Sequence, residues 1–129
     1  MKILFDAMGG DNAPDANITG AVNAIEKINA EIILIGNEKI LNERIKELYG
    51  KENIIELSDR IKIVNAEEEI TMEDSPTKAI KTKKNSSMVV GFNMLKNGEG
   101  DVFLSAGNSG ALLAGATLLV GRIKGIDRP

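Results

Sequence analysis

The sequence contains no cysteine and no histidine. These two absences exclude disulfides, thiolate nucleophiles, Ser-His or Cys-His catalytic pairs and the usual zinc ligands from this chain. Aromatic residues make up only 3% of the 129 residues, although 43% are hydrophobic. We therefore expect residues 1–129 to form a single α/β domain whose core consists of Ile, Val, Leu and Ala.

The sequence also has no large excess of either charge and no long apolar run. Its 16 Lys and Arg residues against 19 Asp and Glu residues give a net charge of -3. This balance provides no general attraction for nucleic acid or an anionic membrane, so nucleic acid is not an expected partner. The longest uncharged stretch, Val102 to Gly121, contains four glycines, whereas a membrane span requires about 20 mostly apolar residues. The short apolar run after Lys2 does not resemble a signal peptide, and we expect a cytoplasmic protein.

Apolar runs typical of strands alternate with helical patterns along the chain. Strands are expected at residues 2–7, 31–36, 60–66 and 101–104, and helices are expected to begin near Pro14, Asn37, Ser75–Pro76, Ser86 or Ser87, and Asn108. This alternation predicts a three-layer α/β fold with a mostly parallel sheet, helices on both faces and right-handed crossovers. In such sheets, ligands bind at the carboxyl ends of the strands.

The segment Ser105-Ala-Gly-Asn-Ser-Gly110 leads from a short strand into an uncharged helix. Free backbone N–H groups and the positive end of the helix dipole converge at such a turn, so phosphate is a candidate ligand. The alternative is that Asn108 caps the helix and the glycines permit the turn. The segment lacks the Gly-Lys-Ser/Thr of a P-loop, and the chain has no Gly-x-Gly-x-x-Gly fingerprint.

Asp6 and Asp11 flank a Gly-Gly pair at the end of the first predicted strand. Two carboxylates are weak evidence for a metal ion, because hard cations recruit several oxygen ligands, and we expect no metal here. Capping and loop shaping is the favoured interpretation. The lysines between Lys78 and Lys84 are typical of a solvated helix face, but they are also suited to binding phosphate or an acidic protein. For Gly115, which interrupts an apolar helix, close packing is the simplest explanation.

Three segments carry a resemblance to a known family. They are Asp6-Ala-Met-Gly-Gly-Asp11, Lys83-Lys-Asn-Ser-Ser-Met88, and Ser105-Ala-Gly-Asn-Ser-Gly-Ala-Leu112 with its continuation to Val120-Gly-Arg-Ile-Lys-Gly-Ile-Asp-Arg-Pro129. The chain resembles the amino-terminal portion of the bacterial phosphate acyltransferases, the PlsX family of acyl-carrier-protein:phosphate acyltransferases. Ser109 stands where many members have Thr, which preserves the hydroxyl.

The resemblance implies transfer of a fatty acyl group from acyl carrier protein to inorganic phosphate, giving an acyl phosphate for phospholipid synthesis. It implies a homodimer with the fold of isocitrate and isopropylmalate dehydrogenases, active without NAD or a required metal. Family members continue well beyond the Asp-Arg-Pro segment. We therefore expect the 129 residues alone to have little or no activity, and peripheral membrane association to involve the later part.

The resemblance and the motifs together define a predicted substrate site, although neither identifies a catalytic acid or base. The phosphate ligands would be Gly107, Asn108, Ser109 and Gly110, the facing wall Asp6, Gly9, Gly10 and Asp11, and weaker contacts Lys84, Ser87 and Arg122. Two alternatives stay open at this point. One is a phosphotransacetylase-like or dehydrogenase-like enzyme that uses a coenzyme A thioester or NAD, and the other is a non-catalytic module for phosphate binding or dimerisation.

Overall fold

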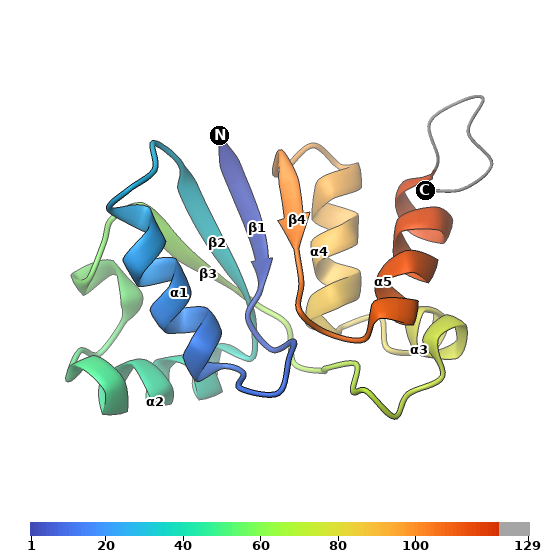
Figure 1. The fold of residues 1–129 in the computed structure, drawn as a ribbon, viewed down its shortest axis with the longest axis horizontal. Coiled ribbons are helices and arrows are strands. Elements are labelled where there is room, and N and C mark those ends of the chain that lie inside the picture. The colour runs from blue at the N-terminus through green and yellow to red at the C-terminus, as the bar shows by residue number, and fades with distance from the viewer. Residues whose placement is uncertain (122–129) are drawn as a thin grey trace.

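Strands and helices alternate through most of the computed structural model, which describes residues 1–121 (Figure 1). In chain order the elements are β1 (Lys2–Asp6), α1 (Asp15–Ile25), β2 (Glu31–Gly36), α2 (Glu38–Tyr49), the 3-10 turn η1 (Ile54–Glu56), β3 (Ile61–Asn65), α3 (Pro76–Thr82), α4 (Ser87–Lys96), β4 (Val102–Leu104), α5 (Ser109–Gly115) and the π-helical turn η2 (Ala116–Val120).

The four strands form one sheet in the order β3-β2-β1-β4, and every neighbouring pair is parallel. In the central strand β1, Leu4 lies opposite Ile33 of β2 and Phe103 of β4. The chain thus moves from β1 outward to β3 and then returns to the other side of β1. This confirms the predicted three-layer α/β class. The finer resemblance to the dehydrogenases remains a prediction, because many three-layer folds contain such a sheet.

Two apolar layers bury the faces of the sheet. On one face, α1 and α2 contribute Ile18, Ile25, Leu41 and Ile45, which pack with Leu34 of β2. On the other face, the neighbours Ile33 and Ile35 pack with Leu4 and with the α4 side chains of Met94 and Leu95. Because successive side chains of a strand point to opposite faces, a strand covered on both sides must be apolar throughout, as residues 32–35 are.

The helix boundaries follow the capping residues that the sequence predicts. Asn37 Oδ1 accepts a hydrogen bond from Ile40 N at 3.2 Å, and Ser86 Oγ accepts one from Val89 N at 3.2 Å. Gly50 ends α2 with a φ of 69°, the left-handed conformation that glycine tolerates best. The sequence patterns did not predict η1 or the π-helical turn η2.

Within residues 1–121, no helix is long and apolar enough to cross a membrane.

A third apolar cluster joins α3, α4 and α5 beside the sheet. Phe92 of α4 packs edge-to-face on Phe103 of β4, with ring centroids 5.0 Å apart. Gly115 lies so close to Phe92 and Ile80 that a Cβ atom would overlap the Phe92 ring. Close packing between helices therefore explains Gly115, as expected.

Substituting this glycine tests the packing. We expect Gly115→Ala to lower the free energy of unfolding by about 1–3 kcal/mol, because the added methyl group overpacks the cluster. Gly20→Ala in α1 is the matched control, since nothing lies within 4 Å of a Cβ atom there. That variant should gain up to about 1 kcal/mol from helix propensity. Denaturant unfolding followed by circular dichroism measures both, and equal effects would contradict the packing argument.

Candidate functional site

Two glycine-containing loops meet at the carboxyl ends of β1 and β4. A Cβ atom on Gly9 would lie 2.8 Å from Gly107 N, and one on Gly10 would lie 3.3 Å from the Cβ of Ala106. Gly10 also has a φ of +100°, which side chains rarely permit. We call this contact of residues 9–10 with residues 106–107 the glycine junction. The sequence predicted both loops for the site, and the fold brings them into direct contact.

The buried side chain of Asp6 stabilises the glycine junction by accepting hydrogen bonds from the segments around it. Its Oδ1 accepts hydrogen bonds from Ser87 Oγ at 2.6 Å and Met8 N at 3.0 Å, and its Oδ2 accepts one from Ser105 Oγ at 2.8 Å. Asp6 is only 2% exposed, as is Ser87. Both carboxylate oxygens are thus engaged within the protein. Asp6 shapes the loop, as one interpretation of the sequence proposed, but its side chain does not cap α1.

A buried amide that the sequence patterns did not single out fixes the other side of the junction. Asn17 Nδ2 donates to the carbonyl oxygens of Ala7 at 2.8 Å and Gly9 at 2.9 Å. The available signal was its helical register, since Asn17 lies four residues before the buried Ala21 on the apolar face of α1. A polar side chain on such a face needs hydrogen-bond partners.

Asn108 performs the capping role that was the alternative to phosphate binding. Its Oδ1 accepts a hydrogen bond from Ala111 N at 3.0 Å, and its Nδ2 donates to Thr71 O at 3.0 Å and Asp74 O at 3.2 Å. The residue is 6% exposed. Both ends of the amide are therefore occupied by protein groups, and Asn108 ties the start of α5 to the loop 67–74.

An ion pair anchors the far end of that loop. Asp74 Oδ2 accepts hydrogen bonds from Lys83 Nζ and Thr71 N, each at 2.8 Å. The hydrogen bond from Lys83 and then that from the Thr71 backbone lower the pKa of Asp74 below its ordinary value. Lys83 Nζ also donates to Glu69 O at 3.0 Å. Loop 67–74 is thereby fixed as one wall of the site.

A cavity of about 290 Å³ lies between this loop and the glycine junction. The described residues that line it include Gly10 and Gly107 together with three acidic residues, Asp11, Glu69 and Glu73, and none of these described lining residues is a lysine or an arginine. This charge opposes a phosphate ion unless cations from other residues compensate it. Within residues 1–121, no three carboxylates are grouped so that they could hold a metal ion.

The remaining predicted residues are dispersed. Ser109 and Gly110 are exposed in the first turn of α5, where helix geometry leaves backbone N–H groups without intrahelical partners. Gly110 also packs against Pro76, so helix packing is a second reason for its lack of a side chain. Lys84 is exposed and lines a separate groove between α3, α4 and η2. Arg122 lies outside the described residues.

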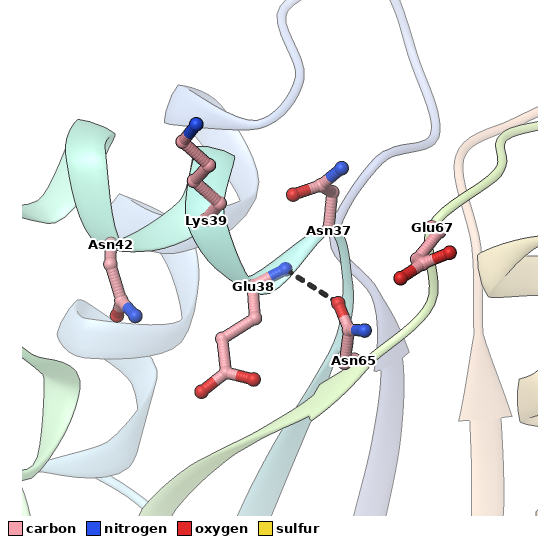
Figure 2. A pocket seen from close by; sticks show the side chains of 6 residues that line it. All are labelled: Asn37, Glu38, Lys39, Asn42, Asn65 and Glu67. Carbon is pink, nitrogen blue, oxygen red and sulfur yellow. Dashed lines mark hydrogen bonds between the residues drawn. The ribbon is translucent and has the colours of Figure 1, made fainter.

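A broader cavity of about 590 Å³ lies at the start of α2, and none of the predicted site residues that the structure describes lines it (Figure 2). Asn65 Oδ1 accepts a hydrogen bond from Glu38 N at 3.0 Å, and the Asn37 side chain caps the same helix. These two polar side chains thus serve the helix start. The carboxylates of Glu38 and Glu67 and the ammonium group of Lys39 line an open surface around them. We assign this cavity no ligand.

The role of Asn108 is testable with an isosteric change. Asn108→Asp keeps the acceptor for Ala111 N but replaces the donor that faces two carbonyl oxygens. We expect the free energy of unfolding to fall by about 1–3 kcal/mol, with faster proteolysis within loop 67–74. The control is Asn37→Asp, where the side chain accepts the capping hydrogen bond and Asp caps as well as Asn. Equal losses in the two variants would contradict this role.

The Asp74–Lys83 pair predicts a pH dependence of stability. Because the folded pKa of Asp74 lies below its unfolded value, its contribution is complete above the ordinary carboxyl pKa of about 4 and is lost as the pH falls through the lower folded value. The stability difference between the wild type and Asp74→Asn should therefore shrink over that acidic range. Unfolding titrations at several pH values measure it. In a Lys83→Met background the difference should be smaller above about pH 4, where the contribution of Asp74 is complete, and an unchanged difference there would contradict the pairing.

Comparison with known proteins finds a family and individual relatives that match the whole chain. A family described as "Fatty acid synthesis protein" matches residues 1–129. Proteins named phosphate acyltransferase from Acetivibrio thermocellus and Clostridioides difficile are 56% and 49% identical, each over 100% of this chain. The chain spans only 37% and 36% of their lengths, within their amino-terminal parts. The chain belongs to the family of fatty acid synthesis proteins that its full length matches.

Proposed function

We propose that this chain forms the phosphate side of the active site of an acyl-carrier-protein:phosphate acyltransferase. The observation that carries the proposal is the glycine junction, where two loops meet beside the exposed first turn of α5 at the carboxyl edge of a parallel sheet. The names of the relatives support the same activity.

The predicted residues have four different roles within this proposal. Backbone N–H groups of Ser109 and Gly110, with the Ser109 hydroxyl, bind phosphate oxygens at the start of α5. Gly9, Gly10 and Gly107 keep the approach free of side chains. Asp6, Ser87 and Asn108 act through the loops that they hold, because their polar atoms are engaged there. Asp11 remains a proposed contact from the rim of the cavity, and Lys84, which lines the separate groove, remains a proposed substrate contact.

The reaction needs no nucleophile from the protein. A phosphate oxygen attacks the thioester carbonyl carbon, a tetrahedral oxyanion forms, and the C–S bond breaks while the new C–O bond to phosphate remains. The proton of the hydrogen phosphate passes to the departing thiolate of the carrier, so atoms and charge balance. The absence of Cys and His is therefore compatible with this chemistry. Positioning and electrostatic stabilisation provide the rate enhancement.

The charge of the cavity requires partners outside the described residues. Lys83 is paired with Asp74, and the cavity beside Gly107 is acidic. We propose that Arg122 and residues of the longer family architecture supply the compensating cations. Acyl carrier protein as the donor, a homodimer, a cytoplasmic location and peripheral membrane association are further parts of the same proposal.

Ser109 provides the sharpest test. The assay protein is a chimera that joins this chain to the remaining part of the Acetivibrio thermocellus relative. Ser109→Ala should raise the KM for phosphate about tenfold or more, because a hydrogen bond to a charged group contributes about 1.5–3 kcal/mol. Ser58→Ala, near η1, is the matched control and should leave the KM unchanged. An unchanged KM in Ser109→Ala would refute the assignment, and a preference for coenzyme A thioesters over carrier thioesters would favour a phosphotransacetylase-like enzyme.

A further inference from the structure

Helix α1 fixes two peptide groups of the loop that follows β1. In the first turn of this helix, Asn17 Nδ2 donates to the carbonyl oxygens of Ala7 at 2.8 Å and Gly9 at 2.9 Å. Asn17 is only 8% exposed, and both of these loop residues are buried, so a carbonyl oxygen that lost this donor would have little access to water. One side chain therefore determines the direction of two peptide groups.

The direction of a carbonyl group also determines that of the N–H group in the same peptide. The peptide bonds of this loop before Ala13 are trans, and in a planar trans peptide the C=O and N–H groups point in opposite directions. The Ala7–Met8 peptide illustrates this, because its oxygen accepts from Asn17 while Met8 N donates to Asp6 Oδ1 at 3.0 Å. The N–H of Gly10 likewise points away from Asn17.

The two N–H groups differ in their partners. Met8 N donates to the Asp6 carboxylate, whereas Gly10 N donates to no group among residues 1–121. Gly10 is half-buried and lines the cavity of about 290 Å³ beside loop 67–74, and Asn17 is not among the lining residues. A backbone N–H group is a strong donor that requires an acceptor. A ligand in the cavity could supply that acceptor to Gly10.

The acidic lining of the cavity indicates which substrate group this N–H meets. The charge of Asp11, Glu69 and Glu73 opposes a phosphate ion but not an uncharged thioester. Ile70 and Met72 add apolar surface to the same lining. In the proposed reaction, negative charge develops on the thioester oxygen only when a phosphate oxygen bonds to the carbonyl carbon. A donor fixed at that position acts on the transition state rather than on substrate binding.

We propose that the N–H of Gly10 enters the cavity and binds this oxyanion, and that Asn17 is the positioning residue that directs it. The inference rests on the proposed function and names the group that stabilises its tetrahedral intermediate. The electron pair that moves to the carbonyl oxygen as the C–O bond forms returns as the C–S bond breaks, and the N–H keeps its proton throughout. Asn17 does not touch the substrate but acts through the Gly9 carbonyl. The glycine junction brings this peptide beside residues 106–107, which lead to the proposed phosphate site at α5.

Changing Asn17 tests the positioning role in the chimera with the remaining part of the Acetivibrio thermocellus relative. Asn17→Asp keeps the shape of the side chain but replaces the donor that faces the two carbonyl oxygens. We expect kcat to fall at least about tenfold, while the KM for phosphate changes less than about twofold. Asn23→Asp, the same change at an exposed position of α1, is the matched control and should leave both constants unchanged. An unchanged kcat in Asn17→Asp would overturn the positioning role.

Removing the N–H itself tests the donor even if the Asn17 variant does not fold. Glycolic acid at position 10, introduced by nonsense suppression in cell-free translation, replaces the Gly9–Gly10 amide by an ester and removes this N–H without adding a side chain. We expect kcat to fall about 100-fold or more. The same ester at Gly50, whose N–H donates to Lys46 O at 2.8 Å at the end of α2, is the control. It should lower stability without changing kcat.

The outcomes separate the oxyanion donor from the proposed function. If the unsubstituted chimera forms no acyl phosphate, both fail. If it does form acyl phosphate, and the ester at position 10 leaves kcat unchanged or raises only the KM for phosphate, the oxyanion role of Gly10 is refuted. The phosphate assignment would then still stand, provided that Ser109→Ala raises the KM for phosphate.

Discussion

The geometry of this protein depends on one buried carboxylate. Asp6 is the last residue of the central strand, and it accepts hydrogen bonds from Ser87 at the start of α4 and Ser105 after β4. One side chain thus joins segments that are 81 and 99 residues apart in sequence. A buried polar group is stable only when such partners satisfy it. The strand ends that carry the candidate site are therefore fixed relative to one another.

The candidate site contains two kinds of residue. Some are engaged in hydrogen bonds that hold the loops, and others remain exposed and accessible to a ligand. Asp6, Asn17 and Asn108 use their polar atoms to hold the loops, whereas Ser109 and Gly110 stay exposed at the start of α5. Hydrogen bonds within the protein engage both carboxylate oxygens of Asp6, the amide nitrogen of Asn17 and both ends of the Asn108 amide. This arrangement leaves backbone groups and one hydroxyl for a ligand, which suits a reaction that relies on positioning.

The acidic lining of the cavity limits how an anion could bind beside the glycine junction. Asp11, Glu69 and Glu73 surround the space beside Gly107, and an anion there needs positive charge from elsewhere. The loop that borders this space follows β4, which is the outermost strand on that side of the sheet among the described residues.

The sequence by itself determined the order of the strands and helices, because apolar periodicity, helix caps and glycine stops are local properties. Asn37, Ser86 and Gly50 mark their helix ends where the pattern predicts them. The motifs also predicted both loops of the candidate site. The roles of their side chains were decided only by the tertiary structure. Asn108 binds loop 67–74 and Ser87 binds Asp6 because residues distant in sequence become neighbours, and the burial and partners that such contacts create cannot be deduced from spacing along the chain.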